Sequence, residues 1–469
     1  MTAGLRDIRE IEHLLIPLPD GTQLAARLWL PVDAERNPVP AILEYLPYRK
    51  RDGTSERDSM THPWLAARGY AGVRVDIRGS GESDGLLADE YSPIEQADAL
   101  AVIDWLARQP WCDGSVGMMG ISWGGFNALQ VAALRPPGMR AVLSLSSTDD
   151  RYADDIHYMG GCHITENIGW ASTMFGFNSR PPDPAIVGDR WHELWLARLE
   201  ANRPWLLDWL RHQRRDDFWR HGSVCEDYAA IEAAVLLVGG WTDGYTNSIS
   251  RLLEHLTCPR LGIIGPWGHA WPHAARPGPR IGLLQEALRF WDHWLLDRDT
   301  GIMAEPMLRA WLMHWVAPAP EYEERPGRWV AEATWPSPSI TSLRLRTSTD
   351  GRLEPDPYTP ENGTRRLAPI QITGITGGNW DPYGYQGELP IDQREDDGRA
   401  MTFDSEPLAE AFTLLGTPLV ELEVAIDRSV GFVSGRLCDV APDGRSTRVS
   451  YGLLNLPHDD SHAEVAPLQ

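Results

Sequence analysis

The chain has 469 residues, more than one ordinary domain needs, so two or three domains are expected. Its 43 Lys and Arg residues stand against 66 Asp and Glu residues, which gives a formal net charge of −23. This negative excess disfavours binding to the phosphate backbone of nucleic acid or to an anionic membrane surface. The expected partner is therefore a neutral or cationic small molecule.

The five cysteines are scattered along the chain, and none forms a Cys-x-x-Cys pair. This distribution argues against a disulfide framework and against a zinc knuckle. The N-terminal segment lacks the basic stretch and apolar core of a secretory signal, and no run of about 18 apolar residues occurs. We expect a cytoplasmic protein in a reducing compartment.

The first half of the chain alternates between predicted strands and helices. Residues 8–32 alternate on both sides of an Asp-Gly pair, which predicts a β-hairpin. Buried strands are predicted at 41–46 and 70–77, with helical spacing at 63–68 between them.

The next helix has a clear start in the sequence Ser92-Pro93-Ile94-Glu95. Serine is a favoured N-cap, proline suits the first helical position, and the glutamate completes a capping box. A further apolar strand is predicted at 141–146. The alternation of strands and helices predicts a mostly parallel, doubly wound sheet.

Residues 120–125 read Gly-Ile-Ser-Trp-Gly-Gly and follow a short apolar run. A serine flanked by glycines between a buried strand and a helix is the nucleophile-elbow pattern, in which a sharp turn exposes the hydroxyl of Ser122. Side chains at Gly120 or Gly124 would clash within such a turn. Short Gly-x-Ser-x-Gly strings also occur by chance in glycine-rich chains, so a structural turn is the alternative interpretation.

The pattern changes after about residue 149. Trp-rich, charged helical stretches at 189–199 and 203–212 predict a helical insertion that forms a lid. Apolar strands resume at 234–240 and 261–265, and an aromatic-rich helix is predicted at 282–296.

The last third of the chain is punctuated by prolines. Short alternating runs at 342–346 and 419–426 predict a β-sandwich. Four segments are therefore expected: the first part of an α/β-hydrolase domain at 1–148, the lid at 149–230, the second part at 231–303 and a C-terminal jelly-roll-like β domain at 304–469.

A serine hydroxyl needs a histidine to accept its proton and a carboxylate to hold the imidazole. In the elbow fold these residues follow in the order Ser, Asp, His at the ends of later strands. Asp243 directly follows one predicted strand, and His269 follows the next. A turn carboxylate and a surface histidine are the simpler alternatives, and His273 is the nearest substitute base.

Several motifs occur in one order along nearly the whole chain: 47–48, 76–85, the elbow, 240–243, 265–269 and 290–294. Together they resemble the cocaine esterase and X-Pro dipeptidyl-peptidase type of α/β-hydrolases, the S15 peptidase group. The resemblance implies an α/β-hydrolase fold with a helical lid and a C-terminal jelly roll. Members usually carry a complete jelly roll. Because this chain is shorter, a truncated jelly roll with an exposed edge strand is one expectation.

The same resemblance implies roles for five residues. Ser122 is the expected nucleophile, His269 the general base and Asp243 its orienting acid. The expected oxyanion hole consists of the Tyr48 hydroxyl and the backbone N–H of Trp123. Many members have tyrosine where this chain has Trp123, but only the backbone N–H is needed there.

The expected reaction is cleavage of an acyl ester, or an amide, through an acyl-enzyme on Ser122. The alternatives are an X-Pro dipeptidyl-peptidase and an α-amino acid ester hydrolase or acylase, which need a site for a free amino group. Glu166, Asp154 and Asp155 are candidates by position, although solvated lid charges are the simpler interpretation. A non-catalytic α/β-hydrolase-fold binding protein usually lacks a triad member, and none is missing here.

No cofactor and no metal are expected. His157, Cys162 and His163 lie close together, but their spacing matches no zinc pattern, so lid packing is favoured. The glycine-containing loop at 78–83 lacks the third glycine of a dinucleotide fingerprint. The expected partner is a small-molecule ester or amide, with neither nucleic acid nor membrane, and assembly into a homo-oligomer stays open.

Overall fold

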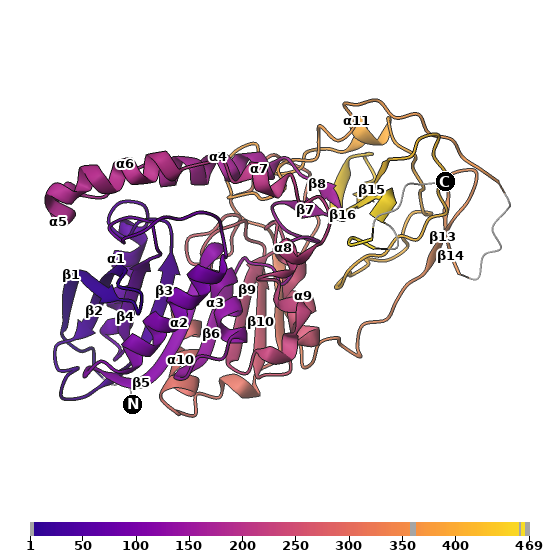
Figure 1. Cartoon of the computed structure of the whole chain (residues 1–469). Helices are drawn as coiled ribbons and strands as arrows, with labels where there is room; N and C mark the ends of the chain where they lie inside the picture. The colour runs from indigo at the N-terminus through magenta and orange to yellow at the C-terminus, as the bar shows by residue number, and fades with distance from the viewer. Residues whose placement is uncertain (1–3, 357–362, 459–460, 465–469) are drawn as a thin grey trace.

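A ten-stranded mixed sheet organises the larger part of the computed structural model (Figure 1). The structure describes residues 4–356, 363–458 and 461–464. The strand order is β1-β2-β4-β3-β5-β6-β9-β10-β11-β12. The bounds are β1 Ile8–Pro17, β2 Gln23–Pro31, β3 Val39–Leu46, β4 Ala71–Asp76, β5 Cys112–Ile121, β6 Met139–Leu145, β9 Ala234–Gly240, β10 Arg260–Gly265, β11 Leu308–Met313 and β12 Gly327–Glu332.

The centre of the sheet is parallel and its two edges are antiparallel. The central strands from β4 to β11 pair in parallel, whereas β2 and β12 run antiparallel to their neighbours in this set. The outermost strand β1 is antiparallel to β2 and so runs in the central direction again. The hairpin predicted around the Asp-Gly pair is confirmed as β1 and β2, with Ile16 opposite Leu24. The carboxyl ends of the parallel strands lie at one edge of the sheet, where ligands bind in such folds.

Helices cover both faces of the sheet. Helices α2 (Pro93–Ala107), α3 (Trp123–Ala133) and α9 (Thr246–His255) share one apolar core with it, and α1 (Ser55–Ala66) and α10 (Leu283–Leu295) share the other. Strand β6 shows the expected alternation, because Leu143 belongs to the second core and Val142 to the first. Both faces of the central strands are buried, which explains their nearly continuous apolar sequence.

The predicted start of α2 is confirmed. The Ser92 side chain accepts a hydrogen bond from the Glu95 backbone N–H at 3.3 Å, and Pro93 occupies the first helical position. Helix α1 differs from the expected stretch at 63–68, because it begins at Ser55 and contains Pro63. Its sheet-facing side carries buried polar side chains, including Asp58 and His62, so apolar spacing did not reveal its first two turns.

A helical insertion follows β6 and ends at β9. It contains a short hairpin and five α-helices. In Figure 1, the helices α5, α6, α4 and α7 form a row along one end of the sheet, whereas α8 lies below this row. Their bounds are β7 Tyr158–Met159, β8 Cys162–His163, α4 Glu166–Asn178, α5 Pro184–Val187, α6 Trp191–Ala201, α7 Leu206–Trp209 and α8 Asp217–Arg220.

The C-terminal part contributes two strands to the main sheet and then continues separately. It contains the hairpin β13 (Leu345–Thr347) with β14 (Leu353–Pro355), the short helix α11 (Arg394–Asp397), and the hairpin β15 (Phe432–Val440) with β16 (Ser446–Asn455). The strand expected at 342–346 overlaps β13 only in part. The strand expected at 419–426 is not formed, since no neighbouring strand pairs with this stretch among the described residues.

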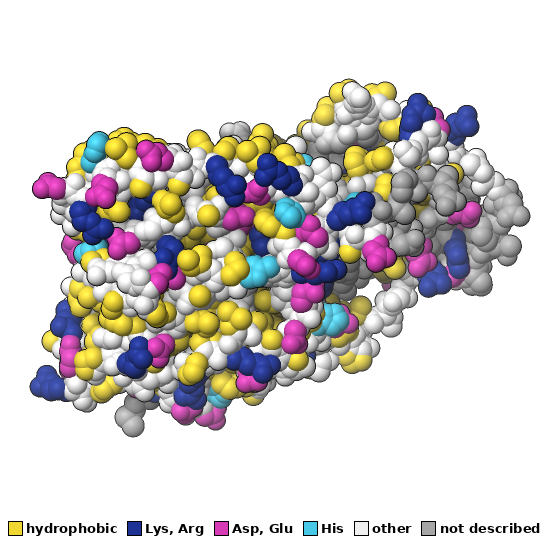
Figure 2. All heavy atoms as spheres, viewed as in Figure 1, with side chains coloured by type: hydrophobic (Ala, Val, Ile, Leu, Met, Phe, Trp, Pro, Cys, Tyr) yellow, Lys and Arg dark blue, Asp and Glu magenta, His cyan; other side chains and the backbone are white. Residues whose placement is uncertain are grey.

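Two surface properties bear on possible partners. On the face drawn in Figure 2, acidic and basic side chains are interspersed rather than gathered into a patch of one sign. Among the described helices, none has the length and apolar character needed to cross a membrane.

Candidate active site

Ser122 lies at the sharp turn between β5 and α3. Its backbone has φ = 58° and ψ = −124°, a strained conformation for a residue with a side chain. Its N–H donates to the Leu145 carbonyl at 3.0 Å, and its own carbonyl accepts from the Phe126 N–H at 2.9 Å. These bonds to the neighbouring strand and to the helix hold the elbow that the sequence predicted.

The turn requires glycine on both sides of the serine. A Cβ atom at Gly120 would lie 2.5 Å from the Gly124 Cα, and one at Gly124 would lie 2.9 Å from a Leu46 methyl group. The expected clash at these two positions is therefore confirmed. Because the N-terminal amides of a helix have no intrahelical acceptor, the N–H of Trp123, the first residue of α3, is not used within the helix.

Tyr48 projects from the loop that follows β3 and reaches the elbow. Its hydroxyl interacts with the Ser122 side chain. Burial raises the pKa of Tyr48 well above its usual value, so the phenol stays protonated and can donate a hydrogen bond. Its ring packs against Trp123, Trp170 and Phe177 with centroid distances of 5.7 to 6.3 Å.

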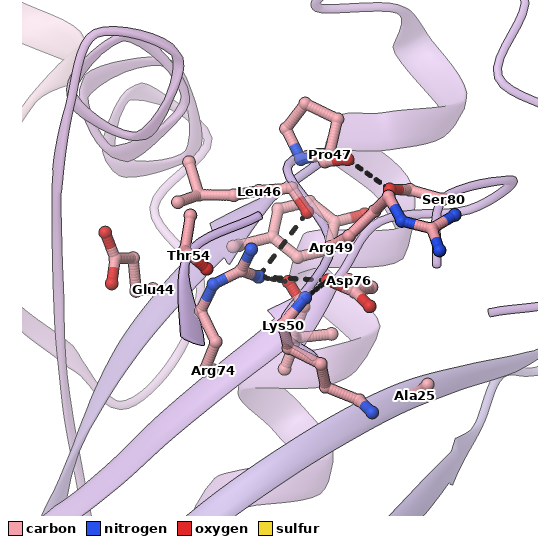
Figure 3. Close-up of polar contacts among 12 residues, drawn as sticks. Ala25, Glu44, Leu46, Pro47, Arg49, Lys50, Thr54, Arg74, Asp76 and Ser80 are labelled. Carbon is pink, nitrogen blue, oxygen red and sulfur yellow. Dashed lines mark hydrogen bonds and ion pairs between the residues drawn. The ribbon is translucent and has the colours of Figure 1, made fainter. Parts of the chain in front are cut away.

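A buried polar network fixes the loop that carries Tyr48 (Figure 3). Asp76 accepts the Lys50 backbone N–H at 2.8 Å and lies 3.4 Å from the Arg74 guanidinium. The Ser80 hydroxyl donates to the carbonyl of Pro47, the residue before Tyr48. The motif at 76–85 therefore anchors the loop that carries Tyr48.

The motif at 76–85, which anchors the loop of Tyr48, also contacts the helical insertion. Lys50 is fully buried and pairs with Glu82 at 2.8 Å. On either side of Glu82, the carbonyls of Gly81 and Ser83 accept hydrogen bonds of 2.8 and 2.7 Å from Arg198 of α6. The insertion thus contacts the loop system that positions Tyr48.

The Trp123 indole is fully buried behind the elbow. Its Nε1 donates to Glu95 at 2.7 Å, so this glutamate serves both the start of α2 and the wall behind Ser122. Burial raises the pKa of Glu95 to about 8. The Glu95 side chain thus bonds to Trp123 instead of closing the predicted capping box, while its backbone N–H bonds to Ser92.

Asp243 and His269 follow β9 and β10 and lie side by side. The distance from His269 Nδ1 to Asp243 Oδ1 is 3.4 Å, and both side chains are buried. Asp243 Oδ1 also accepts the Tyr245 backbone N–H at 2.9 Å, which fixes the carboxylate. The alternative base His273 lies apart from this pair, with its ring near Trp271 and Arg57.

A second carboxylate lies at the same imidazole nitrogen. Asp381, from the C-terminal part of the chain, is 3.5 Å from His269 Nδ1. Burial opposes protonation of His269, but Asp381 and Asp243 outweigh it and raise the pKa of His269 to about 9. Asp381 could not be identified as a site residue from the sequence, because its irregular, proline-containing segment has no periodicity and follows no predicted strand.

A small cavity of about 20 Å³ adjoins Ser122, large enough for about one water molecule. Its walls include Ser122, Asp155, Trp170, Tyr245 and Asp381. The catalytic-side loops, the helical insertion and the C-terminal part all line it.

The candidate carboxylates of the insertion have different surroundings. Asp154 is buried and paired with Arg251 at 2.9 Å, whereas Glu166 accepts the Trp380 backbone N–H at 3.4 Å. Asp155 is buried at the cavity wall, and its Oδ2 has no hydrogen-bond partner among the described residues. Solvated lid charge is therefore the wrong interpretation for Asp154 and Asp155.

His157 contributes to packing within the insertion. Its Nε2 lies 2.7 Å from Glu90, and its Nδ1 lies 3.1 Å from Asn167. Glu90 also accepts hydrogen bonds from Arg151 and from Trp170, which lines the cavity. This network holds one wall of the cavity in place.

Within the described part of the chain, two groups of buried side chains each place three potential ligand atoms within 4.8 Å of one another. The first consists of Glu44, Asp58 and His62, where Arg57 pairs with both carboxylates at 2.7 Å and so supplies the positive charge. The second consists of Asp243, His269 and Asp381, whose shared partner is the imidazole N–H.

Comparison with known families fits this arrangement. A family model described as X-Pro dipeptidyl-peptidase (S15 family) matches residues 20–271, more than half of the chain. The chain belongs to this family. A second model, described as the X-Pro dipeptidyl-peptidase C-terminal non-catalytic domain, matches residues 300–469.

Individual relatives cover most of the chain. A Mycobacterium bovis protein named as a serine esterase is 28% identical over 528 aligned residues, which span 94% of this chain and 80% of the relative. The cocaine esterase of a Rhodococcus species is 26% identical, spanning 96% of this chain and 83% of the relative. Together with the family match, they make this chain a serine hydrolase.

A solved structure supports the fold. An α-amino acid ester hydrolase superposes with a TM-score of 0.73 at 20% identity, covering 99% of this chain and 84% of that protein. The α/β-hydrolase sheet and the C-terminal β domain predicted from the sequence are thus confirmed at the level of the fold.

Proposed function

We propose that Ser122, His269 and Asp243 are the nucleophile, general base and orienting acid of an ester-cleaving acyl transfer. Three features support this proposal. Ser122 lies at a strained elbow, His269 and Asp243 lie at the ends of the following strands, and all three belong to the segment that matches the family.

The reaction proceeds in two steps. Ser122 Oγ attacks the carbonyl carbon while His269 Nε2 takes its proton. The bond to the alcohol breaks, and the departing oxygen receives that proton. Water then gives a proton to His269 and attacks the acyl carbon, which releases the acid and restores Ser122.

The Tyr48 hydroxyl and the Trp123 backbone N–H form the proposed oxyanion hole. The observation that carries the whole assignment is the strained turn at Ser122, because it holds the serine at the start of α3 next to the Tyr48 phenol, which burial keeps protonated. A rigid donor directed at developing charge stabilises the tetrahedral intermediate without reorganisation.

A serine-directed fluorophosphonate tests the nucleophile. We expect one adduct per chain on the peptide that contains Ser122, and none in Ser122→Ala. A non-catalytic binding protein of the same fold would remain unlabelled. A label on another serine, with Ser122 unmodified in an active sample, would contradict the assignment.

Simple esters are the preferred substrate class, because alcohols leave more readily than amines. A panel of aryl and alkyl esters, compared with alanyl-prolyl anilide, measures this preference. We expect kcat/KM to be higher for the esters, with Ser122→Ala as the background control.

A second candidate substrate is an ester or peptide with a free α-amino group, and Asp155 favours it. Asp155 lines the cavity that Ser122 also lines, and its Oδ2 has no hydrogen-bond partner among the described residues. Burial raises the pKa of Asp155 to about 7. An ammonium group placed there would supply the missing partner and return the carboxyl to its charged form.

Paired substrates distinguish the two candidates. We expect Asp155→Asn to raise KM for an α-amino ester while leaving KM for its N-acetylated analogue unchanged. Equal KM changes for both substrates would exclude amine recognition by Asp155.

We also infer the remaining organisation from the sequence. The division into 1–148, 149–230, 231–303 and 304–469 is our proposed domain arrangement, with the last part lending two strands to the sheet. The acidic charge and scattered cysteines support a cytoplasmic enzyme with a small-molecule substrate and no nucleic-acid or membrane partner. Cell fractionation tests the location, and light scattering tests for a homo-oligomer.

A further inference from the structure

Two carboxylates share one nitrogen of His269. Asp243 and Asp381 lie 3.4 and 3.5 Å from Nδ1, so neither is clearly the preferred acceptor of its proton. Both contacts are long for a hydrogen bond, as is common before a substrate is bound. Asp243 belongs to the segment that matches the catalytic family model, whereas Asp381 belongs to the segment described as non-catalytic.

Asp381 is held in place by the catalytic loops themselves. Its Oδ1 accepts the Gly244 N–H at 3.1 Å, next to Asp243. The following residue, Pro382, accepts the His269 backbone N–H at 2.7 Å. Asp381 thus contacts the loop that carries Asp243, and Pro382 contacts the loop that carries His269.

The approach of this segment to the catalytic loops is close. A Cβ at Gly268 would lie 2.4 Å from the Pro382 carbonyl oxygen, and one at Gly244 would lie 2.8 Å from the Trp380 ring. The Tyr383 ring also meets the His269 ring edge-on at 5.1 Å. The position of Asp381 is therefore set by several contacts beyond its own side chain.

We propose that Asp381 is a positioning residue, a second orienting carboxylate that shares the Nδ1 proton of His269 with Asp243. The C-terminal domain then completes the catalytic site that the sheet domain begins. This inference rests on the proposed function, because it assigns a role to Asp381 through His269.

The charged and titratable groups around this pair come from three parts of the chain. The groups that interact with Asp381 are His269 and Asp243, which follow strands of the sheet, and Glu166 of α4. The phenols of Tyr245, Tyr383 and Tyr451 also interact with it. Burial raises the pKa of Asp381, and the charge of His269 opposes this rise. Among these groups, the imidazolium is the single cation that can balance the carboxylates.

The arrangement has a consequence for the tautomer of His269. A triad with one carboxylate loses about 10⁴-fold in kcat when that group becomes an amide, because the imidazole then adopts the wrong tautomer. Here the second carboxylate still accepts the Nδ1 proton after the first is neutralised. We therefore expect substitution of one carboxylate to lower kcat by less than it does in a triad with a single carboxylate. The effects of the two substitutions on kcat should not be additive.

The first experiment measures the pH dependence of kcat/KM for an aryl ester. Removing one of two nearby negative charges lowers the pKa of the imidazolium. We expect Asp381→Asn to move the acid limb to lower pH by about one unit. The matched control is Asp392→Asn, which removes a carboxylate of the same domain that pairs with Arg394.

The control should retain the wild-type pH profile. A superimposable profile in Asp381→Asn would overturn the proposal and leave Asp381 with only a structural role, as a tie to Gly244. Thermal unfolding of each variant shows whether a change in rate reflects a loss of folded protein.

The second experiment compares Asp243→Asn with the double variant Asp243→Asn/Asp381→Asn. We expect the single variant to lose about 10- to 100-fold in kcat, and the double variant to approach the ~10⁴-fold loss of a triad without its carboxylate. A full ~10⁴-fold loss in the single variant would overturn the proposal. If the variants that carry Asp381→Asn do not fold, the loss in Asp243→Asn alone still tests the proposal.

Failure of this inference is separable from failure of the proposed function. If fluorophosphonate labels Ser122 in the wild type and both experiments give the contrary result, only the role of Asp381 is wrong. If Ser122 is not labelled in an active sample, the triad itself is wrong.

Discussion

The sheet and the C-terminal part of this chain contribute to the site in different ways. In the sheet, each candidate residue directly follows a strand: Ser122 after β5, Asp243 after β9 and His269 after β10. In the C-terminal part, Asp381 lies in an irregular segment and is fixed by contacts with the other region. Regular structure thus positions the first three residues, whereas contact between distant segments positions the fourth.

The same contrast appears in burial. The central strands are buried on both faces, whereas apolar side chains of the C-terminal part, such as Leu419 and Phe432, are exposed. A buried strand offers a rigid support with little freedom, which suits the nucleophile and base. In the C-terminal part, the position of Asp381 is fixed by contacts with the loops that follow strands of the sheet.

The largest expected effect tests whether the chemistry belongs to the sheet. We expect Ser122→Ala to lower kcat by about 10⁶-fold, because no other group can form the acyl-enzyme. Single-turnover kinetics with an activated aryl ester measure this loss. Residual activity within about tenfold of the wild type would place the reaction elsewhere in the molecule.

The next effect concerns the loop after β3. We expect Tyr48→Phe to lower kcat by about 10²- to 10³-fold, since one oxyanion donor is lost. The matched control is Tyr45→Phe. Tyr45 is a buried tyrosine on β3, and its hydroxyl donates to the Glu95 carbonyl at 3.3 Å. The control should cost about 1 kcal/mol of stability and leave kcat unchanged. Equal kcat values for the two variants would remove Tyr48 from the site.

The pH dependence measures the joint effect of both regions on His269. A general base must be unprotonated, and the two carboxylates raise the pKa of His269 to about 9. We therefore expect kcat/KM to fall about tenfold per pH unit below that value and to level off above it. An acid limb centred at or below pH 6.5 would show that the carboxylates do not stabilise the imidazolium.

The smallest effect concerns the rigidity of the elbow. We expect Gly120→Ala to destabilise the protein by about 1–3 kcal/mol, because its methyl group would overlap Gly124. Gly169→Ala is the matched control, at an exposed helical position with open space, and should stabilise by about 0.5–1 kcal/mol. Urea unfolding measures both, and equal stabilities would contradict the tight elbow.

The comparison also explains what the sequence could predict. The hairpin before β3, the start of α2, the elbow and the residues after β9 and β10 each have a local pattern of spacing, capping or turn residues. The first turns of α1 were missed because its buried face is polar, bearing Asp58 and His62. Local patterns report the chain's own conformation, and they succeed where that conformation alone positions the residue.

Asp381 illustrates the limit of this approach. Its role depends on a distance to His269, 112 residues earlier in the chain, and no spacing within its own segment encodes that distance. The unpaired Oδ2 of Asp155 is likewise a property of its surroundings rather than of its neighbours in sequence. The proposed triad could therefore be predicted from the sequence more readily than the side chains that surround it.

The most direct measurement of the central claim is a crystal structure of the fluorophosphonate adduct. The account predicts phosphorus bonded to Ser122 Oγ, with the phosphonyl oxygen accepting hydrogen bonds from the Tyr48 hydroxyl and the Trp123 N–H, and with His269 beside the leaving-group side. An adduct whose phosphonyl oxygen points away from both donors, or whose phosphorus is bonded to another residue, would contradict it.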